Sequence, residues 1–379
     1  MTSLSRAINI DDLRRLARSR APRMIFDYID GGAEDETTLG ANVDAFRARK
    51  LLPKMLVDVS DVDPSTEIMG RRAQWPFVVS PTAASRLFHR DGEAAVASAA
   101  ANAGLVYSLS TMGSLAIEDI ARIHTGSKWF QVYVWRDREL VRQGLARAKA
   151  AGYEVLVLTA DVPVAGKRER DPRNEFSIPP RVTARNAMDA LSRPRWLWDL
   201  LTSPKITPAN FEGIGDDHPR GIIGFIDSQF DRSVDWDDVA WLIEEWGGPV
   251  AVKGIMRPDD ARRAVEVGAE AVWVSNHGGR QLDRAPATID VLEAIVGAVD
   301  GRARVIFDGG IRRGVDIVTA LALGADAVAI GRAYLYGLAA GGEAGVRRAI
   351  EILQDETTRA MALIGARRIS EIDRSCLDD

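Results

Sequence analysis

Eight short, mainly apolar segments, each followed by a segment with helical character, constrain the fold of this 379-residue chain more than any other feature. Strands that are apolar along their whole length are typical of parallel sheets whose two faces are both covered by helices. Segments 259–267 and 314–323 show the apolar spacing of such outer helices. Eight alternating units predict a closed (β/α)8 TIM barrel, with an open doubly wound sheet as the alternative. The predicted strands are 77–80, 106–109, 129–134, 155–159, 250–253, 271–274, 305–307 and 327–330.

We expect the whole chain, 1–379, to form a single domain built on this barrel. An insertion after the fourth strand is far longer than a strand-to-helix connection requires, and such insertions are commonly lids or binding loops. The first segment carries a helical pattern over 11–28 and is expected to cap the bottom of the barrel and one side of its mouth. The parts are an N-terminal cap (1–75), the barrel (76–360), the insertion (178–230) and a C-terminal tail (361–379).

The charge balance and the rare residue types exclude several classes of function. With 49 basic and 54 acidic residues the net charge is -5, so the chain has no overall attraction to nucleic acid. The single cysteine, Cys376, excludes an internal disulfide and fits a reducing compartment. The four histidines lack the spacing of metal ligands, so no metal site is predicted. Neither a secretory signal nor an apolar segment of bilayer-spanning length is evident.

Every predicted strand ends in, or is followed by, a segment that contains polar residues or glycine. In a barrel of parallel strands the carboxyl ends of all strands meet at one face, where catalytic groups lie. The sequence therefore predicts a site at that face. The segments are Pro81-Thr82-Ala83, Ser110-Thr111, Gln131-Val132-Tyr133, Thr159-Ala160-Asp161, Lys253-Gly254, Ser275-Asn276-His277, Asp308-Gly309-Gly310-Ile311-Arg312 and Gly331-Arg332.

His277 and Arg280 follow the sixth predicted strand. Histidine can accept a proton near neutral pH, and a guanidinium can bind a carboxylate through its planar fork. The pair predicts a carboxylic acid substrate with an abstractable proton. A capping histidine with a surface salt bridge is the alternative for so short a motif, and the polar ends of the other strands favour the catalytic interpretation.

The segments after strands seven and eight predict a phosphate site. Glycine lets backbone N–H groups approach a phosphate, and Arg312 and Arg332 can pair with its charge. Tight turns with surface arginines are the alternative. Lys253, at the end of an apolar strand, could form a Schiff base or lie beside a flavin ring. Asp161 could orient His277 or cap the following helix.

Six motifs in a fixed order extend these observations. Together they resemble the FMN-dependent L-2-hydroxy-acid dehydrogenase and oxidase family, which includes glycolate oxidase, L-lactate dehydrogenase and mandelate dehydrogenase. The resemblance covers nearly the whole chain and disfavours a Schiff-base aldolase. The motifs are Trp-Phe-Gln-Val-Tyr (129–133), Leu-Thr-Ala-Asp-Val-Pro (158–163), Val-Lys-Gly (252–254), Ser-Asn-His-Gly-Gly-Arg-Gln-Leu-Asp (275–283), Asp-Gly-Gly-Ile-Arg-Arg-Gly (308–314) and Ile-Gly-Arg (330–332).

The resemblance implies a role for each matching residue. It makes His277 the base that removes the C2 hydrogen or the hydroxyl proton, with Asp161 as its partner, and it places Lys253 at the N1/O2 edge of FMN. Tyr133 would contact the substrate hydroxyl. The substrate carboxylate would be held by Tyr28, Arg280 and Arg168, and we expect Met112 and Ala165 to line the pocket for the substrate side chain. The implied FMN-binding residues are Pro81, Thr82, Ala83, Ser110, Gln131, Thr159, Lys253, Ser275, Asp308, Gly310, Arg312, Gly331 and Arg332.

The implied reaction is the two-electron oxidation of an L-2-hydroxy acid to a 2-oxo acid with reduction of FMN. L-lactate is the first choice of substrate and mandelate the second. An FMN barrel isomerase and a catalytically silent flavin barrel are the distant alternatives. The resemblance also implies a homotetramer.

The electron acceptor is expected to be a quinone. No haem-binding extension is evident, so electron transfer to a fused cytochrome domain is not expected. Segment 181–205 combines tryptophan, leucine and basic residues, which suits peripheral contact with the cytoplasmic side of the cell membrane. A lid packed on its own barrel or on a neighbouring subunit is the alternative. Ala83 occupies a position where several dehydrogenases of the family that this chain resembles have glycine and many of its oxidases have alanine. Oxygen is therefore the alternative electron acceptor.

Overall fold

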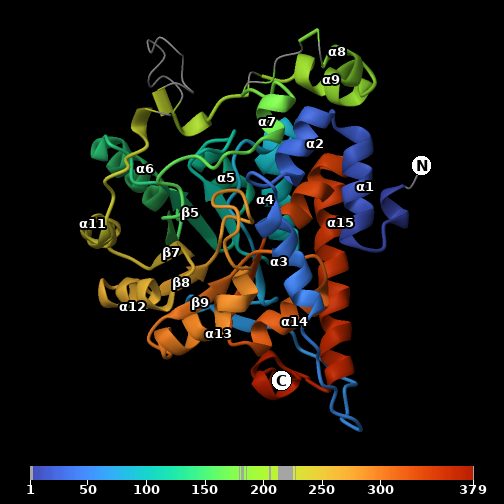
Figure 1. The fold of residues 1–379 in the computed structure, drawn as a ribbon, viewed down its shortest axis with the longest axis vertical. Coiled ribbons are helices and arrows are strands. Elements are labelled where there is room, and N and C mark those ends of the chain that lie inside the picture. Colours follow the sequence, from blue (N-terminus) through green and yellow to red (C-terminus); the bar gives the residue numbers. More distant parts are fainter. Residues whose placement is uncertain are drawn as a thin grey trace.

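A closed barrel of eight parallel strands forms the centre of the molecule, as predicted (Figure 1). The computed structural model describes residues 3–178, 180, 183–184, 186–204, 206–211, 225–226 and 228–378. Neighbouring strands follow the order β10-β3-β4-β5-β6-β7-β8-β9, and β10 pairs with β3 to close the barrel. The strands are β3 (Phe77–Val79), β4 (Tyr107–Ser110), β5 (Lys128–Val132), β6 (Val155–Thr159), β7 (Val250–Ile255), β8 (Ala271–Val274), β9 (Arg304–Phe307) and β10 (Ala327–Ile330).

Helices follow the strands and surround the barrel (Figure 1). The two helices expected at 259–267 and 314–323 are α12 and α14, each within one residue of its predicted bounds. In α12 the side chains of Ala261 and Ala264 are buried against the barrel. Acidic residues occupy its first turn, where they interact favourably with the positive end of the helix dipole. The surrounding helices are α4 (Gly92–Asn102), α5 (Ile117–Ile123), α6 (Arg138–Ala150), α11 (Trp236–Trp246), α12 (Pro258–Glu266), α13 (Thr288–Val299), α14 (Gly314–Ala322) and α15 (Arg332–Ile364).

The barrel interior is apolar at its amino-terminal end. Trp129 and Trp273 meet edge to face there, 6.2 Å apart, and both are almost fully buried. Ile68 and Ala73 pack against the same cluster from the hairpin of β1 (Thr66–Ile68) and β2 (Arg71–Ala73). Because side chains fill this end, an open cavity can form only at the carboxyl ends of the strands.

The helix expected over residues 11–28 is two helices, so that prediction was wrong in this detail. They are α1 (Ile10–Arg20) and α2 (Arg23–Asp30). Pro22 separates them: the residue before a proline is driven out of the helical region, and Ala21 accordingly has ψ 146°. The break lets α1 pack along α15 and directs the end of α2 toward the barrel mouth. Other short elements of the N- and C-terminal segments are η1 (Leu4–Arg6), α3 (Thr37–Arg47), η2 (Ser85–Leu87), η4 (Ile369–Glu371) and η5 (Arg374–Cys376).

The insertion after β6 packs one face against its own chain. Its α8 and α9 lie beyond the outer ends of α1 and α2 (Figure 1). Trp196 is buried, and its Nε1 donates a hydrogen bond to the carbonyl of Leu87 at 2.9 Å. Arg181 and Lys205, the ends of the segment expected to contact a membrane, lie outside the described residues. Its described elements are α8 (Ala187–Leu191), α9 (Pro194–Thr202) and η3 (Ala209–Phe211), and α7 (Arg170–Arg173) lies between β6 and the insertion. Among the described helices, none combines the length and the apolar character needed to cross a bilayer.

Candidate active site

A cavity of about 320 Å³ opens at the carboxyl ends of the barrel strands. Every barrel strand, or the segment directly after it, contributes to its wall, and α2 adds Tyr28 and Ile29. This volume is within the usual range of small-molecule sites. Nearly all residues predicted for the site line it. The exceptions are Asp161 and Ser275, which lie behind the wall and contact lining residues, and Met112, which does not line it.

His277 is held against a buried carboxylate. Its Nδ1 lies 2.9 Å from Oδ1 of Asp161, which leaves Nε2 free of that contact. The backbone of His277 has φ 56°, a conformation uncommon outside glycine, and its N–H donates to Ser275 Oγ at 3.1 Å. Burial raises the pKa of Asp161, but His277 and Lys253 outweigh it, so that the pKa falls below its ordinary value. Asp161 therefore stays ionised and can stabilise a protonated His277.

Gly254 makes the approach of Asp161 possible. Its φ is 108°, and a Cβ built there would lie 2.7 Å from Cβ of Asp161. This explains the glycine that follows Lys253 in the sequence.

Lys253 is a buried cation paired with two carboxylates. Its Nζ donates to Ser275 Oγ at 2.8 Å and lies 3.3 Å from Asp308 and 4.0 Å from Asp161. Burial lowers the pKa of Lys253, yet the carboxylates of Asp308 and Asp161 raise it above its ordinary value overall. A Schiff base requires the neutral amine, so this environment disfavours that alternative and suits a permanent positive charge.

Asp308 and Ser275 support Lys253. Asp308 also accepts hydrogen bonds from Trp273 Nε1 at 3.0 Å and Ser275 Oγ at 2.7 Å. The family resemblance implied that Asp308 binds FMN. It lines the cavity, and its described contacts are those of an anchor for the lysine.

Two arginines flank the ring of Tyr28. The guanidinium of Arg280 lies 4.9 Å from the ring centroid and that of Arg168 lies 5.4 Å from it. Arg280 also donates to the carbonyl of Tyr28 at 2.6 Å. Burial lowers the pKa of Arg280, and the charge of Arg168 lowers it further. Asp171, 3.3 Å from Arg168, is the carboxylate paired with these cations. Buried positive charge with one acidic partner favours an anion such as a carboxylate.

The opposite wall fits a flavin ring. Ser110 donates to Gln131 and Gln131 donates to Thr159, each at 3.0 Å, and all three are buried in the cavity wall. Such a row of hydroxyl and amide groups can hydrogen-bond the polar edge of an isoalloxazine. Pro81, Thr82 and Ala83 line the cavity beside this row.

The end of the cavity near β9 and β10 fits a phosphate. Gly309 and Gly310 have φ 109° and 83°, which glycine adopts readily, and they bring the backbone to the cavity with Arg312 and Gly331. The donor set therefore suits FMN, with Lys253 as the cation beside the ring.

Arg332, which was expected to bind a phosphate, has backbone carbonyl groups as its hydrogen-bond partners among the described residues. Its guanidinium donates to the carbonyls of Ile29, Gly31 and Gly278 at 2.8 to 2.9 Å, so it ties the end of α2 to the loop of His277. A Cβ on Gly278 would lie 2.6 Å from Arg332 Nη1. Contact between Arg332 and a phosphate stays a prediction.

The structure also shows what sequence reasoning missed. Phe88, Val162 and Phe230 line the cavity. Phe230 comes from the far end of the insertion, where it bridges to Trp135 and packs 5.3 Å from the ring of Tyr133. Nothing in its local sequence marks it. Met112 is not among the lining residues: it packs against the core and its carbonyl accepts a hydrogen bond from the N–H of Ala84, so a place for Met112 beside the substrate stays a prediction.

Comparison with known proteins agrees with this site. The family model described as FMN-dependent dehydrogenase matches residues 17–379. A putative L-lactate dehydrogenase of Mycobacterium tuberculosis is 46% identical over 97% of this chain and 88% of its own length. An L-lactate oxidase of a Nostoc species is 45% identical over the full length of both chains. The crystal structure of the monotopic membrane protein (S)-mandelate dehydrogenase has a TM-score of 0.94 at 39% identity, covering 98% of this chain and 99% of that one. The chain therefore belongs to the FMN-dependent dehydrogenase family, whose members are oxidoreductases that act on CH–OH donors.

Proposed function

We propose that this enzyme oxidises L-lactate to pyruvate and passes the electrons to a quinone. The observation that carries the reaction type is the presence in one cavity of His277 paired with Asp161, and of two arginines beside Tyr28. The first pair can take up a proton, and the arginines can hold a carboxylate close to that base. FMN, when bound, accepts the two electrons that leave C2.

The chain's own residues divide the work. Arg280, Arg168 and Tyr28 bind the carboxylate and orient C2 toward His277. The Nε2 of His277 removes the proton from C2 or from the hydroxyl group of the substrate, and Asp161 stabilises the resulting imidazolium. Tyr133, whose pKa is raised by burial and then by Asp161, keeps its hydroxyl proton and can hydrogen-bond the substrate oxygen. Lys253 supplies positive charge where negative charge develops.

L-lactate is proposed first because two of the relatives compared above are named for it. The side-chain end of the cavity is walled by Phe88, Val162, Ala165 and Phe230. Aromatic walls also suit the phenyl ring of mandelate, the substrate that gives the structural relative its name. (S)-mandelate is therefore the second candidate.

Ala165→Leu tests this assignment of the side-chain pocket. The added methyl groups enter the part of the cavity that a phenyl ring would need and a methyl group would not. We expect the substitution to lower kcat/KM for mandelate by roughly tenfold or more beyond the loss for L-lactate, since small steric changes in such pockets discriminate on this scale. Equal losses for the two acids, in steady-state assays with one artificial acceptor, would contradict the assignment.

We further propose peripheral contact with the cytoplasmic side of the cell membrane, and assembly as a homotetramer, as the family resemblance implies. Met188, Leu191, Trp198 and Leu201 are exposed on α8 and α9, with side chains 65–84% accessible. An apolar face of this kind, with Arg193 and Arg195 nearby, suits the interface of a bilayer. A membrane position supports a quinone as the acceptor.

Anaerobic mixing of the purified enzyme with L-lactate, (S)-mandelate or glycolate tests the proposal. We expect L-lactate to bleach the visible flavin absorbance fastest and a soluble quinone to restore it rapidly. Rapid recovery with oxygen would instead identify an oxidase. Absence of bleaching with any of the three acids would contradict 2-hydroxy-acid oxidation by this site.

A further inference from the structure

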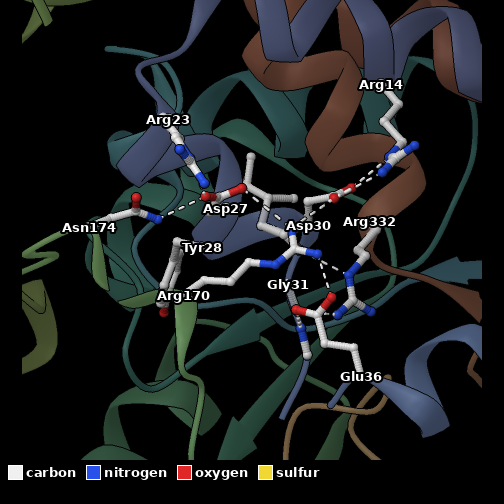
Figure 2. Close-up of polar contacts among 12 residues, drawn as sticks. Arg14, Arg23, Asp27, Tyr28, Asp30, Gly31, Glu36, Arg170, Asn174 and Arg332 are labelled. Carbon is white, nitrogen blue, oxygen red and sulfur yellow. Dashed lines mark hydrogen bonds and ion pairs between the residues drawn. The ribbon is translucent and has the colours of Figure 1, made fainter. Parts of the chain in front are cut away.

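A cluster of three carboxylates around the side chain of Arg170 lies close to Tyr28, which lines the cavity (Figure 2). Arg170, the first residue of α7, lies 3.3 Å from Asp27 and 3.3 Å from Asp30, and it forms a very short ion pair with Glu36. Asp27 and Asp30 belong to α2, and Glu36 belongs to the loop after it. One side chain of α7 therefore bridges two segments of the N-terminal cap.

Arg170 is the cation that these three carboxylates share. The side chains of Asp27, Asp30 and Glu36 are only 13%, 6% and 21% exposed. Asp30 has a second partner in Arg14, and Asp27 has one in Arg23, whose side chain is 78% exposed. Removal of Arg170 would leave Asp30 with its two-point contact to Arg14, but Glu36 would lose its ion pair and Asp27 would keep only its exposed partner Arg23 among the cations described here.

Further contacts of the same segment lie on both sides of Arg170. Asn174 donates to Asp27 at 2.8 Å, and Phe176 stacks on Tyr28 with ring centroids 4.4 Å apart. The N–H of Asp171 donates to the carbonyl of Arg168 at 3.1 Å, so the first turn of α7 also fixes the backbone of Arg168. Arg168 thus lies directly before α7 and Tyr28 lies on α2, and Arg170 joins these two helices.

We propose that Arg170 is a positioning residue for substrate binding: by tying α7 to α2 and Glu36, it sets the separation of Arg168 and Tyr28 around the substrate carboxylate. The inference rests on the proposed role of Arg168 and Tyr28 in binding that carboxylate. Arg170 does not line the cavity and is not a catalytic residue. It acts through the placement of the two side chains that do line it.

The test is Arg170→Met in the FMN-loaded enzyme. We expect KM for the 2-hydroxy acid, and the dissociation constant of oxalate measured from the perturbation of flavin absorbance, to rise roughly tenfold to a hundredfold. Displacements of about 1 Å in positioning groups have effects of this size. We expect kcat to change less than about threefold, because His277 and Lys253 are anchored elsewhere. Arg170→Lys keeps one charge and should recover part of the affinity.

Arg173→Met is the matched control. Arg173 lies in the same short helix, its side chain is 72% exposed and it pairs only locally with Glu169. This variant should leave KM and the oxalate affinity unchanged. If Arg170→Met does not fold, Glu36→Gln replaces it: the amide oxygen can still accept from the N–H of Gly32, while the charge and the oxygen that accepts from Arg170 are lost. We expect a smaller rise of KM in the same direction.

Arg168→Met separates this inference from the proposed function. Unchanged oxalate affinity in that variant would refute the role of Arg168 and with it the route proposed for Arg170. If Arg168→Met weakens oxalate but folded Arg170→Met or Glu36→Gln does not, the proposed function stands and the positioning role is wrong. A fall of kcat with no change in KM or oxalate affinity would also overturn it.

Discussion

His277→Gln should lower kcat by two to four orders of magnitude while the protein keeps the visible spectrum of bound flavin. Loss of a general base typically costs this much. Glutamine can accept or donate a hydrogen bond beside Asp161, but it cannot take up the substrate proton. The Asp161 carboxylate, held 2.9 Å from the imidazole, would then have no imidazolium to stabilise. Stopped-flow reduction by L-lactate under anaerobic conditions measures the effect directly.

His89→Gln is the control for this substitution. His89 pairs with Asp91 and does not line the cavity, so flavin reduction should proceed at the normal rate. Reduction of His277→Gln at a rate within tenfold of the unmodified enzyme would remove His277 from the proposed chemistry.

Arg280→Met should lower kcat/KM by roughly two to three orders of magnitude. Breaking a buried ion pair by removing one partner costs about 3–5 kcal/mol, and each tenfold in an equilibrium corresponds to about 1.4 kcal/mol. The loss should appear mainly as a higher KM, because the bound carboxylate would lose its bidentate partner. Arg280→Lys should recover only part of it, since an ammonium lacks the planar fork.

Arg284→Met is the matched control in the same loop. Its side chain is 78% exposed and faces Asp35, so KM should stay unchanged. If the Arg280→Met variant binds oxalate as tightly as the unmodified enzyme, residues other than Arg280 hold the substrate carboxylate.

The fold and most of the site could be predicted from the sequence. The barrel strands differ from their predicted bounds by two residues at most, because apolar runs and the residues that end them are local signals. Once the strands are placed, barrel topology brings their carboxyl ends together. His277, Lys253, Gln131 and Arg312 therefore meet in one cavity although they are far apart in the chain.

Predictions that depended on side-chain direction were less successful. Met112 follows β4 in the sequence, but its side chain packs against the core. The helix expected over 11–28 is broken at Pro22, although its apolar spacing continues across the break. Arg332 lines the cavity as expected, but its guanidinium also holds three carbonyls, and its contact with a phosphate stays a prediction. The helix break is a local effect of Pro22, whereas contacts with distant segments decide the positions of Met112 and Arg332.

The sequence by itself determined the barrel, the face that carries the site and the residue types available for proton transfer and carboxylate binding. Only the tertiary structure decided that Asp308 and Ser275 anchor Lys253, that Phe88 and Phe230 enclose the cavity, and that Arg170 joins α7 to three carboxylates. The physical reason is range. Strand and helix patterns arise from neighbours in the chain, whereas the charge balance and the shape of a cavity depend on side chains that meet only after the barrel has closed.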